Sequence, residues 1–115
     1  MSLVQLVGNY TLNQTLNIIK EEVPKLGISL EFVDEGYIEN ETGLTYLIVY
    51  EKYFMRVSNR VSLSIMVSEV KGKTQVVAIA SGASQGVLFS FDWGSEEDFV
   101  YEFTNLMLSY QFYRN

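Results

Sequence analysis

The sequence contains no cysteine and no histidine, and only one of its 115 residues is proline. Without cysteine, the chain can form no disulfide, no thiolate nucleophile and no cysteine zinc site. Without histidine, it lacks the commonest general base and the commonest metal ligand. We therefore expect a protein that is not an enzyme, with no cofactor and no metal.

Positive charge is scarce as well, because 8 Lys and Arg stand against 14 Asp and Glu, for a net charge of −6. A nucleic-acid binder needs a basic surface that releases counterions from phosphates, so we expect no nucleic acid as a partner. No apolar run approaches the roughly 20 residues of a membrane-spanning helix, and the first residues carry no basic leader. The expected location is the cytoplasm, with no membrane partner.

Apolar residues are plentiful, at 48% hydrophobic and 14% aromatic. This content is too high for a disordered chain, and the length is typical of one domain. The sequence shows no internal repeat, low-complexity tract or linker. Residues 1–115 are therefore interpreted as a single domain.

Helices are predicted near both ends of the chain. Thr11 can cap the first helix, with Gln14 completing a capping box, and apolar residues then follow at helical spacing until Pro24 interrupts them. Ser95 is the predicted N-cap of a longer helix near the C-terminus, with Asp98 completing its box.

Five strand candidates lie between or beside these helices, each rich in alternating apolar and polar residues. They cover residues 28–32, 44–54, 60–70, 73–81 and 87–93. Residues 3–7 could form a further short strand, residues 34–36 are predicted to be a turn, and residues 37–43 are predicted to be a loop or a frayed edge of the sheet.

This order of elements predicts an α+β fold. A run of hairpins flanked by two one-sided helices is most simply a two-layer sandwich, with an antiparallel meander sheet of about five strands. The N-terminal helix and the long C-terminal helix would then cover one face. The layout resembles helix-grip folds, in which a curved sheet wraps a C-terminal helix.

The other face of the sheet has an unusual composition. A two-residue turn at Lys71-Gly72 would place the alternate residues of strands 60–70 and 73–81 away from the core. These residues mix small hydroxyl groups with apolar side chains: Ser62, Ser64, Met66, Val77 and Ile79. A solvated face usually carries more Lys, Glu and Thr. One interpretation is that a second copy covers this face in a homodimer; the alternative is an open face with a few exposed apolar residues.

One motif suggests chemistry that the rest of the chain does not support. Gly82-Ala83-Ser84-Gln85-Gly86 matches the Gly-x-Ser-x-Gly nucleophile elbow of hydrolases. No histidine is present to activate the serine, and the next residues have the pattern of a strand where an elbow needs a helix. The glycines are better interpreted as a bulge or a tight turn.

Glu51 interrupts the most apolar strand, and a half-buried carboxylate there needs a partner, which Lys52, Arg56 or Arg60 could supply. An ion pair between neighbouring strands is the favoured interpretation. The leading functional hypothesis is a non-enzymatic domain that binds itself or another protein. The alternative is a small-molecule carrier that holds an apolar or aromatic ligand between the sheet and the C-terminal helix, with Glu51, Arg60 and Gln85 as polar anchors.

Three stretches carry a resemblance to a known family: Val49-Tyr50-Glu51-Lys52-Tyr53, Asn59-Arg60-Val61-Ser62 and Ala80-Ser81-Gly82-Ala83-Ser84-Gln85. In these stretches the chain resembles an uncharacterised family of short bacterial proteins, mostly from low-GC Gram-positive bacteria, known only as a domain of unknown function. The resemblance implies a small intracellular α+β domain. It brings no known activity, cofactor or substrate.

Overall fold

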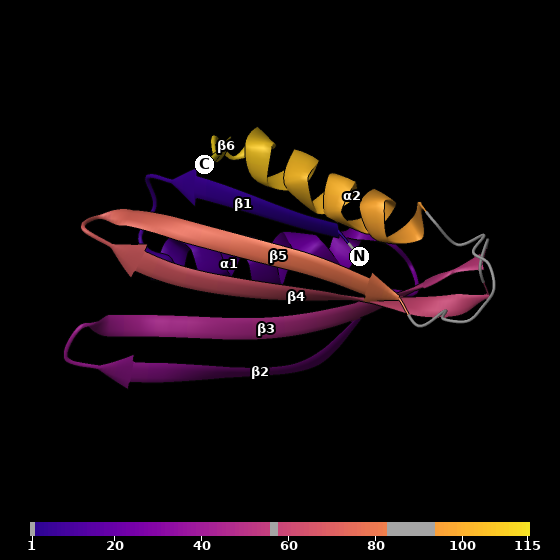
Figure 1. Ribbon diagram of the computed structural model, residues 1–115, viewed down its shortest axis with the longest axis horizontal. Coiled ribbons are helices and arrows are strands. Elements are labelled where there is room, and N and C mark those ends of the chain that lie inside the picture. The colour runs from indigo at the N-terminus through magenta and orange to yellow at the C-terminus, as the bar shows by residue number, and fades with distance from the viewer. Residues whose placement is uncertain (1, 56–57, 83–93) are drawn as a thin grey trace.

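The computed structural model describes residues 2–55, 58–82 and 94–115, which contain two α-helices, one short 3₁₀ helix and six β-strands (Figure 1). In chain order the elements are β1 (Ser2–Gly8), α1 (Leu12–Glu22), the 3₁₀ helix η1 (Val23–Leu26), β2 (Glu31–Asn40), β3 (Gly43–Phe54), β4 (Asn59–Val70), β5 (Lys73–Gly82), α2 (Ser95–Ser109) and β6 (Tyr113–Arg114). The predicted α+β class is confirmed.

The six strands form one antiparallel sheet in the order β2-β3-β4-β5-β1-β6. Strands β2 to β5 are a meander of consecutive hairpins. The N-terminal strand β1 then pairs with β5 on one side and with β6 on the other. Residues 3–7 therefore belong to the interior of the sheet, and β6 is a strand that the sequence pattern did not reveal.

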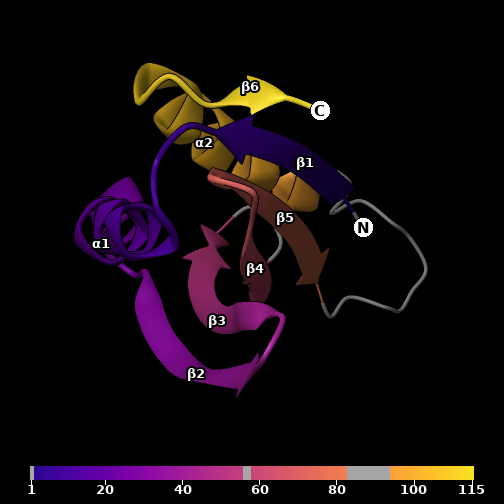
Figure 2. The ribbon, with the colours of Figure 1, turned by 90° about the vertical axis from the view of Figure 1, so that its left-hand side faces the viewer.

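Both helices pack against one face of this sheet, which is called the inner face. Figure 2 looks along the strands and shows α1 and α2 on the same side of a curved sheet. One continuous core joins the two helices to the sheet, and every second residue of β4 is buried in it. Its largest fully buried side chains are Leu6, Ile19, Ile48, Tyr50, Leu63, Ile65, Phe99, Phe103 and Met107.

The start and end of α1 follow the predicted signals. The Gln14 N–H donates to the Thr11 hydroxyl at 3.1 Å, and the Thr11 N–H donates to the Gln14 side-chain oxygen at 2.9 Å, which completes the capping box. Pro24 is the second residue of η1, and the regular α-helix ends two residues before it, at Glu22. Proline has no N–H to continue the helical hydrogen bonds.

The turn between β4 and β5 also has its predicted form. Lys71 and Gly72 both have positive φ angles, 53° and 82°, as a two-residue hairpin turn requires. Val70 pairs with Lys73, and the pairing continues without a shift to Val61 and Gly82. The register predicted for this hairpin is confirmed.

The region between α1 and β3 differs from its prediction. Residues 34–40 continue strand β2 instead of forming a turn and a loop or frayed edge, and a bulge lies between Phe32 and Asp34. All ten residues of β2 are exposed, so the strand has no buried face that would produce an alternating pattern. Its pairing with β3, not burial, holds it extended.

The start of α2 is corrected as well. The N-cap is Gly94, with a φ of 109°, and Ser95 is the first helical residue. The Gly94 N–H donates to the Glu97 side chain at 3.1 Å, so Glu97 takes the place predicted for Asp98. A left-handed φ at the cap position is accessible to glycine at little cost, which explains the shift by one residue. The predicted strand 87–93 lies outside the described residues.

Candidate functional site

The face of the sheet opposite the helices, called the outer face, carries an uncharged centre. Leu47, Met66 and Val77 lie side by side on β3, β4 and β5. Leu47 is 47% exposed and Met66 is 44% exposed. With the rows on either side they form the neutral patch, which consists of Thr45, Leu47, Val49, Ser64, Met66, Ser68, Gln75, Val77 and Ile79. The patch thus combines apolar and uncharged polar side chains over three neighbouring strands, and none of its residues carries a charge.

The neutral patch continues onto the edge strand β2. Ile38 lies beside Thr45 in the register and is 69% exposed. A depression of about 280 Å³, open to solvent, lies at this junction and is lined by Gly36, Tyr37, Ile38, Thr45, Leu47 and Met66. The patch is therefore slightly hollowed and apolar where β2 meets β3.

The residues predicted to form an interface all lie on the outer face. Ser64, Met66, Val77 and Ile79 belong to the neutral patch, and Ser62 lies one row beyond it. The Ser62 hydroxyl donates to the Ser81 carbonyl at 3.1 Å, so this serine also ties β4 to β5. Coverage of the patch by a second copy stays a prediction.

The residues predicted to anchor a ligand are not gathered between the sheet and α2. Glu51 lies beside Ser62 and Glu31 on the outer face, opposite the helices. Arg60 shares this face, and its guanidinium lies 3.7 Å from the Glu31 carboxylate. Gln85 lies outside the described residues. The helix-side carrier site thus loses two of its three proposed anchors, because strand alternation points them the other way.

Lys52, which the sequence offered as a partner for Glu51, instead faces the helices and pairs with a residue of α2. Its ammonium lies 2.8 Å from the Glu102 carboxylate of α2 and donates to the Leu26 carbonyl at 3.0 Å. It also lies 5.0 Å from the centre of the Phe54 ring. The Lys52 side chain is only 14% exposed. Its parity with Tyr50 is the sequence signal that could have placed it on the inner face.

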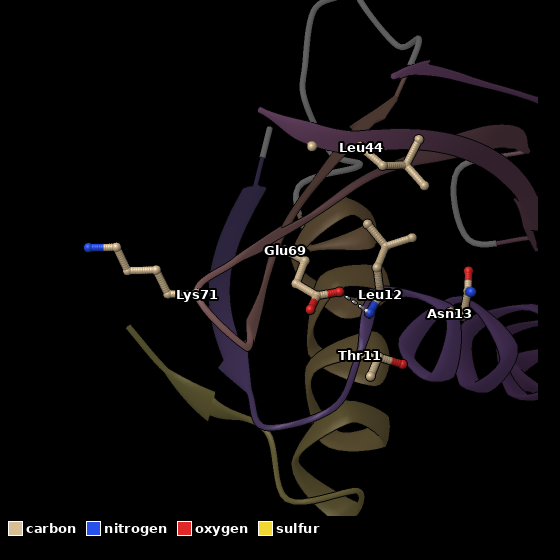
Figure 3. Close-up of a pocket in the computed structure, with 7 residues that line it drawn as sticks. Thr11, Leu12, Asn13, Leu44, Glu69 and Lys71 are labelled. Carbon is tan, nitrogen blue, oxygen red and sulfur yellow. Dashed lines mark hydrogen bonds between the residues drawn. The ribbon is translucent and has the colours of Figure 1, made fainter. Parts of the chain in front are cut away.

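A second hollow, of about 350 Å³, lies beside the N-terminus of α1, between the helix and the hairpin ends of the sheet (Figure 3). The Glu69 carboxylate from β4 accepts a hydrogen bond of 2.9 Å from the Leu12 N–H, drawn as a dashed line. A helix N-terminus attracts anions, and here the chain supplies its own. The Glu69 charge makes this hollow unfavourable for a phosphate or another free anion.

Within residues 2–55, 58–82 and 94–115, no group of three or more acidic side chains is placed to hold a metal ion. None of the helices in these ranges is long and apolar enough to cross a membrane.

The fold and the outer face together define a small α+β domain with an antiparallel sheet that is covered by helices on one side. The chain belongs to the family of unknown function DUF6054, whose sequence pattern matches residues 1–111. The predicted membership in a family of unknown function is thereby confirmed, and the bacterial source of that family stays a prediction. No curated protein matches the chain.

Proposed function

We propose that this protein is a non-enzymatic binding domain that self-associates through the neutral patch. The observation that carries the proposal is the row of Leu47, Met66 and Val77 on adjacent strands, in which Leu47 and Met66 are exposed and Val77 is half-buried. A contiguous apolar surface of this kind in the middle of a sheet is typical of an interaction site. The expected assembly is a homodimer in which two outer faces pack against each other.

The lack of charge on the neutral patch supports a second copy as the partner. Two molecules with a net charge of −6 repel each other, so a surface without carboxylates is the one at which two copies repel each other least. In a two-fold interface the same patch of both copies meets, so both sides of the contact are then uncharged. Ser64 and Ser68 are small and leave room for the larger side chains of the facing sheet, at the roughly 10 Å spacing of packed sheets.

The experiment is native mass spectrometry of the purified protein, followed by sedimentation velocity over a range of concentrations. We expect a dimer for the native sequence and a monomer for Met66→Lys and Ile79→Lys, since each would place a buried, unpaired charge at the interface. Asn105→Lys adds the same charge on the exposed side of α2 and should leave the dimer intact. A native protein that stays monomeric without a bound molecule at about 100 μM, well above the micromolar upper end of the Kd range for interfaces of standard size, would overturn the proposal.

A further inference from the structure

Strand β2 ends the sheet and has β3 as its neighbour on one side. All ten of its residues are exposed, from Glu31 to Asn40. In the part of the chain that the structure describes, no strand pairs with its other side. An exposed strand of this length presents main-chain donors and acceptors that can pair with another extended segment.

The register shows which main-chain groups of β2 are available. Val70 and Lys73 close a two-residue turn and are therefore a hydrogen-bonded pair. Hydrogen-bonded and non-hydrogen-bonded pairs alternate along antiparallel strands. The same alternation can be followed through the register from β4 to β3 and on to β2. It directs the N–H and C=O groups of Asp34, Gly36 and Ile38 toward β3. Those of the intervening residues point to the open side: Glu35, Tyr37 and Glu39.

The side chains on this edge are acidic. Four carboxylates lie along β2, with no basic residue among them: Glu31, Asp34, Glu35 and Glu39. Two of the four are partly compensated from other elements, since Lys20 lies 3.0 Å from Glu35 and Arg60 lies 3.7 Å from Glu31. The net charge of the edge stays negative, which disfavours pairing with the same edge of a second copy.

We propose that β2 is a docking edge for a basic, extended segment of another protein, which adds as a further antiparallel strand. The main chain of Glu35, Tyr37 and Glu39 would supply the hydrogen bonds of this β-augmentation. The acidic side chains of β2 repel the same acidic edge of a second copy and attract Lys and Arg. They therefore favour a basic partner. The edge binds through main-chain groups and acidic side chains that do not belong to the neutral patch, so the proposal does not rest on self-association.

The register also specifies the pattern of the incoming strand. Residues opposite Glu39, Glu35 and Asp34 should be basic, while residues opposite Ile38 and Gly36 should be apolar. The residue opposite Tyr37 should be aromatic or apolar, since the Tyr37 ring stacks on Tyr46 at 5.8 Å between centroids and offers a flat neighbour. Written from its N-terminus, a matching peptide is Lys-Val-Tyr-Val-Lys-Lys.

The test is a nuclear magnetic resonance titration of the isotope-labelled protein with this capped peptide. The control peptide is Glu-Val-Tyr-Val-Glu-Glu, which has the same shape and the opposite charge. We expect the basic peptide to shift the amide signals of Glu35, Tyr37 and Glu39, with weaker binding at higher salt. Equal shifts with both peptides, shifts confined to the neutral patch, or no shift with either peptide would each overturn the proposal.

Two pairs of variants separate the main-chain and charge contributions. Tyr37→Pro removes an outward N–H without removing a bond to β3, which proline tolerates on an edge strand. We expect Tyr37→Pro to bind about 3- to 10-fold more weakly than Tyr37→Val, the equivalent of one hydrogen bond, because both variants lack the ring and only Tyr37→Val keeps the N–H. Glu39→Gln should weaken binding about 2- to 5-fold, and Glu41→Gln, in the turn beyond the strand, should not. Unchanged affinity in both Tyr37→Pro and Glu39→Gln contradicts the docking edge.

Discussion

The two faces of the same sheet differ at every step along its central strands. On β4, Ile65 is fully buried against the helices, whereas its neighbour Met66 is 44% exposed on the outer face. On β5, Ala78 is buried and Ile79 only partly so. Neighbouring residues of one strand thus lie on opposite faces, one in the closed core and the next on the uncharged outer face. Apolar content alone does not identify a core, because what matters is whether the fold supplies a covering layer.

The largest effect on the free energy of unfolding is expected for a substitution in the core on the inner face. Ile65→Ala removes a fully buried side chain, and we expect it to lower the free energy of unfolding by about 2–5 kcal/mol, the range for such cavities. Ser64→Ala, one residue earlier on the outer face, should change it by less than about 0.5 kcal/mol. Urea denaturation followed by circular dichroism measures both. Similar losses at the two positions would contradict the contrast between the faces.

A smaller effect is expected at the charged contact within the inner side. Glu102→Gln takes the negative partner from Lys52, whose ammonium is mostly shielded from water. We expect a loss of about 1–2 kcal/mol, typical of a hydrogen bond to a charged group. Thermal unfolding is the readout, with Glu21→Gln on the exposed surface of α1 as the control. If the two variants unfold at the same temperature, the Lys52 contact contributes nothing.

A still smaller effect is expected for Glu69, which lies near the hairpin end of β4. Glu69→Gln keeps the shape but weakens the acceptor for the Leu12 N–H and removes a negative charge from the positive end of α1. The expected cost is about 0.5–1 kcal/mol, as for other groups at helix ends. It should shrink at high salt, which urea denaturation with and without added salt would reveal. A cost that does not depend on salt would assign Glu69 a purely geometric role.

The smallest effect concerns the exposed pair at the margin of the sheet. The hydrogen bond from Lys20 lowers the pKa of Glu35 below its ordinary value of 4.5, with a further contribution from the Tyr46 hydroxyl. The bond to Glu35 raises the pKa of Lys20 above 10.5. A lowered carboxyl pKa gives stability that is present above its unfolded value and is lost as the pH falls through the folded pKa. A raised ammonium pKa gives stability that is lost as the pH rises through its folded value.

The pair therefore contributes a constant amount to the stability of the fold at any pH between the titration of the Glu35 carboxyl and that of the Lys20 ammonium. This contribution is lost in more acidic and in more basic solution. Glu35→Gln should cost less than about 1 kcal/mol at neutral pH, since the pair is exposed. The difference between the variant and the native protein should vanish in acid. Urea denaturation at acidic and neutral pH measures it, and a difference that persists in acid would exclude the ion pair as its source.

The sequence predicted the parts of the fold that have one buried side. The hairpin of β4 and β5 was placed to the residue, because its alternation and its turn at Lys71-Gly72 require the same register. Strand β2 was missed beyond residue 32, since none of its residues is buried and nothing in its pattern separates it from a loop. Strand β6 is only two residues long and depends on its contact with β1.

The candidate site was predicted in one part and misplaced in another. Met66, Val77 and Ile79 were correctly assigned to the outer face by their parity with the core residues. The carrier hypothesis placed Glu51 and Arg60 next to α2 as polar anchors for a ligand, which their positions along the strands do not allow. The alternation that placed Met66 outward also places Glu51 outward and Lys52 inward. Tertiary partners such as Glu102, 50 residues away, leave no local signal.

The position of β1 has a consequence for the order in which the chain can fold. Its partner β5 begins at Lys73, 65 residues after β1 ends at Gly8, so during synthesis β1 stays unpaired until more than half of the chain has been made. The hairpins from β2 to β5 close between sequence neighbours, and such local contacts form fastest. We therefore expect pulse-labelled hydrogen exchange to protect the amides of β3 and β4 before those of β1, and β6 to join the sheet only after β1 has paired.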